Sequence, residues 1–268
     1  MKAVAPSGAK TFRLMTYNVH RCVGLDGRHA PQRIAEIIAR QDPDIVALQE
    51  LETGHPRTGS IDQAQVLSAI LKADFHYHAA RQRGEARFGN AIFSRLPMRK
   101  VQSAILPTLP QIPIQTRGAL WVAIRVGREE VQIINTHLGL LHHERFLQAG
   151  ALCSKDWLAH PVYQGQPRVL CGDFNATTAS RVYRLFMEAL QDARSLSPSP
   201  AGRTWPSFLP VFRYDHIFVC PRIRVRGVTV PKTPLTVLAS DHLPLVADIE
   251  IREGTDAGAL PAPGEALR

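Results

Sequence analysis

One short segment constrains the fold of this chain more than any other. Residues 169–171 (Val-Leu-Cys) predict a buried strand, and the chain then turns at Gly172. Asp173 and Asn175 follow two residues apart, so both side chains leave the strand end on the same face. Because carboxylates and amides are costly to bury without partners, the segment is either a polar turn or part of a site.

The same arrangement, an apolar strand followed by a polar side chain, recurs along the chain. Taken singly, Asn18 or His137 is explained as well by a structural role as by a catalytic one. A structural role does not explain the recurrence of the pattern equally well. The pattern brings amides, carboxylates and imidazoles to several predicted strand ends and loops: Asn18, Glu50, His137, Asp215, Asp241 and His242. The pattern therefore favours a site built at strand ends.

Strand and helix patterns alternate through both halves of the chain. A helix begins near Pro31 and ends at Asp42, since a residue before proline avoids the helical region. A buried strand follows and ends in Glu50. Further helices are predicted over residues 61–73, 143–160 and 182–190, and a last strand over 245–251. This order predicts the α/β fold class.

Composition shows no boundary that would divide the chain. Its 268 residues are 45% hydrophobic and 21% charged, which suits one large domain with an ample core. We expect that domain over residues 12–252. A flexible leader at 1–11 precedes it, and a disordered tail at 253–268, rich in Gly, Ala and Pro, follows it.

The net charge of +9 favours an anionic partner, such as nucleic acid, an anionic lipid head group or a phosphorylated small molecule. Two runs of arginine could follow a phosphate backbone: Arg81, Arg83 and Arg87, and Arg222, Arg224 and Arg226. The second run alternates along one strand, and a solvated strand face is its simpler interpretation.

Cysteine spacing and the apolar runs indicate the compartment. The four cysteines form no CxxC pair, which argues against a zinc ribbon and indicates reduced thiols: Cys22, Cys153, Cys171 and Cys220. The first residues contain no apolar segment typical of a signal peptide. No apolar run approaches the roughly 18 residues that a transmembrane helix needs. We therefore expect a cytoplasmic protein without a transmembrane segment.

The strand-end residues suit a hard divalent cation. Carboxylates, amides and imidazoles without thiolates are typical ligands and neighbours of Mg²⁺, with Mn²⁺ as the alternative. A cation, hydrogen-bond donors and a carboxylate–imidazole pair can together hydrolyse a phosphoester. A buried polar network is the structural alternative, and a non-catalytic binding module is the functional one. A binding module would be expected to have lost part of this set, and no position is lost.

Six motifs together carry a resemblance to a known family. They occur in the same order as in the endonuclease/exonuclease/phosphatase superfamily, which includes deoxyribonuclease I, abasic-site endonucleases, neutral sphingomyelinases and inositol polyphosphate phosphatases. The resemblance spans roughly residues 12–251 and rests on TYNV (16–19), LQE (48–50), NTH (135–137), GDFN (172–175), YDHI (214–217) and SDH (240–242).

This resemblance implies a four-layer α/β/β/α sandwich with two packed mixed β-sheets. It also implies a Mg²⁺-dependent phosphodiesterase in which water attacks phosphorus in line. The metal would be held by Glu50, with Asn18 and Asp241 around it. The phosphate and the attacking water would be bound by Asp173, Asn175 and His137, and by His242 oriented by Asp215; Asp173 and His242 are both candidates for activating the water.

The chain departs from the abasic-site enzymes at two positions. They have an aspartate where this chain has His20, and a tyrosine where it has His137. Both differences favour the branch of deoxyribonuclease I and the sphingomyelinases. Residues 89–95 and 117–120 resemble bacterial members of unsettled substrate, which makes Asn90 and Arg117 candidates for substrate binding. A surface arginine is the alternative interpretation of Arg117.

Nucleic acid is the first candidate substrate and a phospholipid head group the second. The lipid alternative rests on an apolar, proline-rich loop at residues 105–114 and on Trp205 and Phe208, which could meet a membrane surface. A small phosphorylated metabolite is the third candidate.

Overall fold

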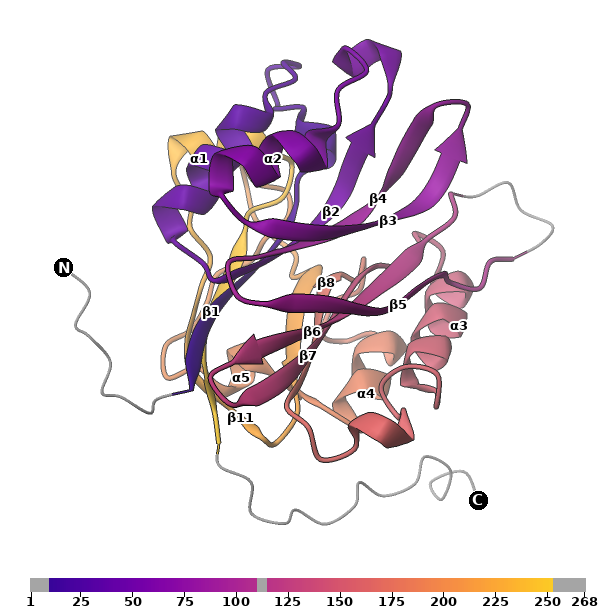
Figure 1. Cartoon of the computed structure of the whole chain (residues 1–268), viewed down its shortest axis with the longest axis vertical. Coiled ribbons are helices and arrows are strands. Elements are labelled where there is room, and N and C mark those ends of the chain that lie inside the picture. The colour runs from indigo at the N-terminus through magenta and orange to yellow at the C-terminus, as the bar shows by residue number, and fades with distance from the viewer. Residues whose placement is uncertain (1–9, 110–114, 253–268) are drawn as a thin grey trace.

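Two six-stranded mixed sheets form the centre of the computed structural model, which describes residues 10–109 and 115–252 (Figure 1). The first sheet has the order β11 (Ile223–Thr229), β12 (Leu245–Ile251), β1 (Thr11–Asn18), β2 (Ile45–Thr53), β4 (Ala86–Ser94), β3 (Asp74–Arg83). The second has the order β5 (Met98–Ile105), β6 (Gly118–Val126), β7 (Glu129–His137), β8 (Arg168–Asp173), β10 (Asp215–Val219), β9 (Gln191–Asp192). The parallel pairs are β1–β2 and β7–β8.

Helices cover the outer face of each sheet (Figure 1). On the first sheet lie α1 (Pro31–Gln41) and α2 (Gln63–Leu71), with α6 (Pro234–Ala239) beside α1. On the second lie α3 (His142–Cys153) and α4 (Arg181–Met187), and α5 (Ala193–Leu196) contacts β10 and β11. Short 3₁₀ turns are η1 (His20–Cys22), η2 (Pro56–Thr58) and η3 (Pro161–Tyr163). The predicted four-layer sandwich is confirmed.

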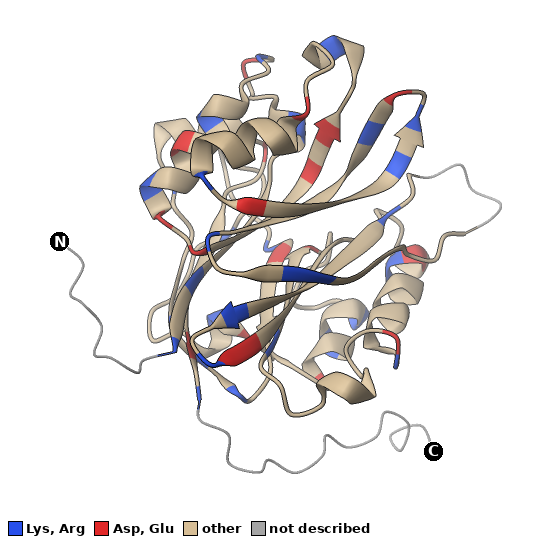
Figure 2. Cartoon of the chain, viewed as in Figure 1, with Lys and Arg blue, Asp and Glu red and all other residues tan. Residues whose placement is uncertain are grey.

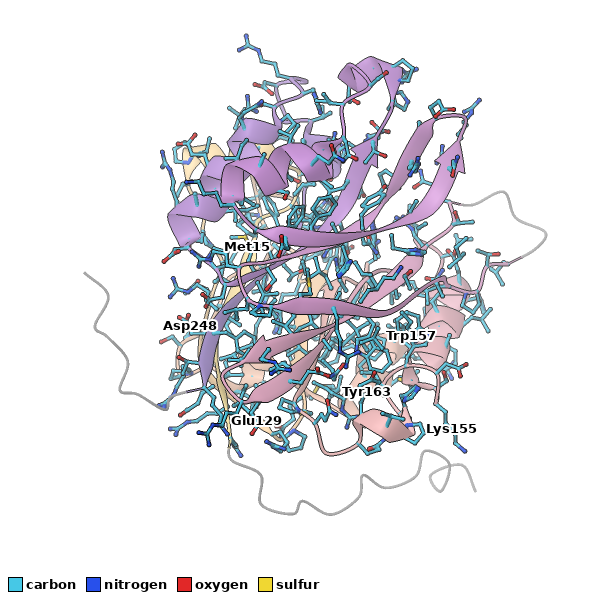
Figure 3. The ribbon with its side chains drawn as sticks, in the orientation of Figure 1. Met15, Glu129, Lys155, Trp157, Tyr163 and Asp248 are labelled. Atoms are coloured by element: carbon cyan, nitrogen blue, oxygen red, sulfur yellow. The ribbon has the colours of Figure 1, made fainter. Side chains whose placement is uncertain are left out.

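Side chains of β1 show how one sheet serves two cores. Phe12 and Leu14 are buried in the core between the sheets. Met15, labelled in Figure 3, and Tyr17 are buried with the residues of α1 and α2. Alternate residues of a strand face opposite sides of a sheet, so a continuous apolar run is what a strand covered on both faces requires.

The described strands run from Thr11 in β1 to Ile251 in β12. β1 begins at Thr11, which pairs with Glu250, so the first strand starts one residue before the expected boundary at residue 12. Residues 1–9 and 253–268, which hold most of the predicted leader and the predicted tail, lie outside the described residues, as do residues 110–114 of the proline-rich loop. All four cysteines are unpaired, and three of them are buried. Among the described helices, none has the length and apolar character to cross a membrane.

The helix predicted over residues 143–160 was too long. It ends at Cys153, because Ser154 has extended backbone angles and the chain turns back. Trp157 and Tyr163 then pack on Trp121, with ring centroids 6.2 and 4.8 Å away (Figure 3). Trp157 and Tyr163 therefore reach the core from the turns that follow α3, and not from a continuation of the helix. The edge strands β3 and β5 were not predicted.

Gly172 allows β8 to approach β7 at the site. Its φ angle is 140°, and a Cβ atom there would lie 1.9 Å from the Thr136 carbonyl oxygen. Only a residue without a side chain fits this conformation and this contact. The turn that precedes Asp173 therefore depends on glycine.

We predict that Gly172→Ala destabilises the protein by about 2–4 kcal/mol, because it combines a left-handed conformation with a backbone clash. Gly150→Ala is the matched control: Gly150 lies in α3, and a Cβ atom added there would have no neighbour within 4 Å outside its own helix backbone. Alanine there should stabilise the helix by roughly 0.5–1 kcal/mol. Urea unfolding measures the free energy of unfolding of each variant. Equal effects of the two substitutions would contradict the close contact at Gly172.

Candidate active site

The strand-end residues of both sheets meet in one cavity of about 1160 Å³. The first sheet contributes Asn18 from β1 and Glu50 from β2, and the second contributes His137 from β7 and Asp173 from β8. The loop before β12 completes the floor of the cavity with Asp241 and His242. Parallel strands within each sheet bring these ends to the same edge, which is why residues far apart in sequence converge.

One carboxylate oxygen, Asp173 Oδ2, is the point at which these groups converge. Asn18 Nδ2 donates to it across 2.9 Å. The Nε2 atoms of His137 and His242 lie 3.4 and 3.5 Å from it. The other oxygen, Oδ1, accepts the backbone N–H of Asn175 across 2.9 Å. Asp173 is buried, and burial raises the pKa of its carboxyl while His242 opposes that effect.

His242 is held between two carboxylates. Its Nδ1 lies 2.9 Å from Asp215 Oδ2, which is the pairing expected from the sequence, and its Nε2 faces Asp173. Burial lowers the pKa of His242, but Asp215 and Asp173 outweigh burial and raise that pKa to about 10. The imidazole is therefore a cation at neutral pH. Asp215, which is fully buried behind it, supplies the compensating charge.

His137 has the opposite character. Arg117 Nη1 lies 3.0 Å from His137 Nδ1, and because an arginine can only donate, Nδ1 accepts. His137 Nε2 lies 3.1 Å from Asn175 Nδ2 and 3.4 Å from Asp173 Oδ2. Burial, together with the charges of Arg117 and His242, lowers the pKa of His137 well below its usual value. The site therefore contains one neutral and one cationic imidazole.

The prediction that Glu50 ends its strand is wrong. β2 continues to Thr53, and its pairing with β4 shifts register between Leu48 and Leu51. Glu50 occupies this bulge with a φ angle of 60°. Bulges re-aim side chains next to active sites, and here Glu50 Oε1 accepts Asn18 Nδ2 across 3.3 Å. The sequence pattern could not show the bulge because the apolar run continues through it.

The two expected substrate-binding residues, Arg117 and Asn90, occupy different places in the structure. Arg117 is not a surface arginine: it is buried beside His137 and still lines the cavity. Asn90 does not line the cavity. It is buried in β4 and donates its amide to the Gly118 carbonyl across 2.9 Å, which ties the first sheet to β6 of the second. Asn90 therefore links the two sheets next to the cavity and is not part of its lining.

Sequence reasoning missed several residues around the cavity. Ser240 Oγ donates to the Asn18 carbonyl across 2.7 Å and accepts the backbone N–H of His242 across 3.2 Å, so it positions both residues. Trp205, expected only at a lipid surface, donates Nε1 to Asp241 Oδ2 across 3.4 Å. Arg145 lines the cavity from α3. The SDH motif was a usable signal for Ser240, and no pattern in the sequence marks Arg145.

The donor set of the cavity fits a hard cation. Glu50 and Asp241 offer carboxylate oxygens, Asn18 donates its amide N–H to Glu50, and no cysteine lines the cavity among the described residues. Asp173, Asp215 and His242 also bring three ligand atoms within 4.8 Å of one another. Both ring nitrogens of His242 already face carboxylates, however, so this second cluster is satisfied as an ion-pair network.

The rim of the cavity is basic although its floor is acidic. Seven arginines and four carboxylate side chains line it. Figure 2 shows basic residues near the ends of the β3–β4 hairpin, and the cavity lining includes Arg81, Arg83 and Arg87 from that hairpin. The basic rim attracts an anion toward the floor of the cavity, where the carboxylates could hold a cation.

Solved structures of other proteins share this fold. Solved structures that share the fold include an endonuclease/exonuclease/phosphatase from Beutenbergia cavernae (TM-score 0.76, 24% identity, covering 92% of this chain and 73% of that one). They also include a mannosyl-6-phosphatase from Bacteroides thetaiotaomicron (TM-score 0.71, 20% identity, covering 89% of this chain and 99% of that one). A third is the human Nocturnin catalytic domain with bound sulfate (TM-score 0.70, 24% identity, covering 91% of this chain and 95% of that one).

A search of the curated proteins found no match. The family model of the Endonuclease/Exonuclease/phosphatase family matches residues 15–242, which include every residue of the cavity floor. The chain belongs to the Endonuclease/Exonuclease/phosphatase family of phosphoester-cleaving enzymes.

Proposed function

We propose that this protein is a Mg²⁺-dependent phosphodiesterase, able to use Mn²⁺, that acts on nucleic acid in the cytoplasm. The observation that carries the proposal is the convergence of Asp173, His242 and Glu50 on the floor of one arginine-rimmed cavity. The unpaired cysteines support a reducing compartment.

Glu50 would hold the cation, with Asn18 and Asp241 beside it. When bound, the cation would neutralise charge on the phosphate oxygens and orient the phosphate for attack. Arg117 is buried and lines the cavity beside His137, so it can meet a phosphate oxygen as well.

The protonation of the two imidazoles supports a division of roles. His242 is cationic and so has no free nitrogen to accept a proton from water. Asp173 is a buried carboxylate whose pKa is raised, which suits a proton acceptor. We assign Asp173, with Asn175, to orient and deprotonate the attacking water. The new bond joins the water oxygen to phosphorus, the bond from phosphorus to the leaving oxygen breaks, and His242 stabilises the charge that develops.

Nucleic acid is the substrate class that the basic rim supports best. A small phosphorylated metabolite is the second candidate, and the specific observation in its favour is the structural likeness to a mannosyl-6-phosphatase. A phospholipid head group is the third, supported by exposed Leu140, Phe208 and Leu209, of which Leu140 lines the cavity.

The metal assignment predicts that Glu50→Gln lowers kcat for phosphodiester hydrolysis about 100-fold or more, because an amide cannot anchor the cation with a charge. EDTA should abolish wild-type activity and added Mg²⁺ should restore it. Glu36→Gln is the control, since Glu36 is exposed on α1 and pairs with Arg40. Wild-type activity of Glu50→Gln in Mg²⁺ would contradict the assignment.

The His242–Asp215 pair predicts a non-additive effect. His242→Ala and Asp215→Asn should each lower kcat by roughly 10²–10⁴-fold, and the double variant should lose little more than His242→Ala, because the two residues act as a unit. Steady-state kinetics of all four proteins measures the coupling, and thermal unfolding checks the fold of each. Fully multiplicative losses would show that the two side chains act independently.

The substrate assignment predicts cleavage of single-stranded DNA or RNA in preference to phosphomonoesters and lipid vesicles. The decisive measurement is one substrate panel at fixed salt: plasmid DNA, single-stranded DNA, RNA, mannose 6-phosphate, and anionic or choline lipid vesicles. Cleavage confined to vesicles, or to the sugar phosphate, would replace nucleic acid with that class.

A further inference from the structure

Four exposed arginines line one side of the cavity, and we call them the arginine wall: Arg57, Arg81, Arg83 and Arg87. Arg81 and Arg83 are alternate residues of β3 and share a face. Arg87 of β4 pairs with Gln82 and so lies on the other face of the hairpin, and Arg57 lies in η2, but all four line the cavity. Figure 2 shows basic residues where the β3–β4 hairpin ends. The wall is separate from the acidic floor that holds the catalytic residues.

The arginine wall differs from the second arginine run, Arg222, Arg224 and Arg226, in its ion pairing. None of its four members forms an ion pair with a described carboxylate. In the second arginine run, by contrast, Arg222 pairs with Glu129, and Arg224 and Arg226 lie 4.0 and 2.7 Å from Glu250. The second run is therefore partly compensated, because Arg224 and Arg226 share Glu250 and Arg222 shares Glu129 with Lys10. The wall keeps its charge available for a ligand.

A cluster of aromatic rings lies next to the catalytic floor. Trp205 and Tyr214 line the cavity, and the Trp205 ring centroid is 6.5 Å from that of His242. Phe212 stacks on Tyr214 with centroids 5.2 Å apart and an interplanar angle of 1°, and it is 40% exposed. An exposed, pre-stacked ring is a surface on which a nucleobase can pack without reordering.

The size of the cavity indicates a ligand with more than one phosphate. The floor already provides Arg117 and His242 for the reacting phosphate, so the wall is not needed for it. The volume of about 1160 Å³ lies above the usual range of small-molecule pockets. Repeated phosphates and stackable bases match a cavity whose lining includes both the charged wall and aromatic rings.

We propose that the arginine wall binds the non-scissile phosphates of a single-stranded polynucleotide whose bases pack on the aromatic cluster of Trp205, Phe212 and Tyr214. This inference rests on the proposed phosphodiesterase function. It adds that affinity grows with the number of substrate phosphates, and that the wall, not the second arginine run, sets this dependence.

Binding can be tested apart from catalysis. Fluorescence anisotropy of a labelled single-stranded octanucleotide, in EDTA, should show that Arg81→Ala/Arg83→Ala weakens binding about tenfold. The slope of log affinity against log salt should fall by about 1.4, since each single-strand phosphate contact contributes about 0.7. Phe212→Ala should weaken binding about fivefold with an unchanged salt slope, because stacking is not ionic.

The matched control is Arg224→Ala/Arg226→Ala, which removes the same charge from β11 and should leave both affinity and salt slope at wild-type values. In Mg²⁺, the loss of kcat/KM in Arg81→Ala/Arg83→Ala should be greatest for the octanucleotide, smaller for a dinucleotide and least for bis(p-nitrophenyl) phosphate.

Three outcomes separate the inference from the proposed function. If the wild type hydrolyses no phosphodiester in Mg²⁺, the proposed function fails. If it does, but the wall variant and the β11 variant give the same salt slope, the inference alone is wrong. If Arg81→Ala/Arg83→Ala weakens binding to phosphatidylserine vesicles but not to the octanucleotide, the inference is also overturned, in favour of a lipid surface.

Discussion

The site depends on how one buried carboxylate oxygen is partnered. Asp173 Oδ2 receives Asn18 from the first sheet and faces His137 and His242 from the second sheet and the loop before β12. A buried charge costs several kcal/mol unless it is paired and hydrogen-bonded. These contacts therefore stabilise Asp173 as an anion, and the same contacts bring the ends of the two sheets into register around the cavity.

Backbone irregularities gather around this carboxylate. Glu50 and Asn175 have φ angles of 60° and 47°, and Gly172 has one of 140°. Each such conformation in a residue with a side chain costs about 1–3 kcal/mol, so it persists only where its surroundings hold it. Here the surroundings are a sheet on either side. The result is that the carboxylate of Glu50 and the amide of Asn175 point into the cavity and not along their sheets.

Charge is distributed so that one cavity can receive both a cation and an anion. The floor carries carboxylates and one imidazolium, while the rim carries arginines without carboxylate partners among the described residues. Long-range attraction by the rim and short-range binding by the floor are different functions of charge, and the fold separates them by using strand ends for the floor and the β3–β4 hairpin for the rim.

The sequence by itself determined the α/β class, most helices and strands, and the membership of nearly every floor residue, because apolar periodicity and strand-end motifs are local signals. Only the tertiary structure decided the bulge that aims Glu50, the burial of Arg117 beside His137, the structural role of Asn90 and the cationic state of His242. Each of these depends on partners more than 15 residues away or on desolvation, and neither is encoded in the spacing of residues along the chain.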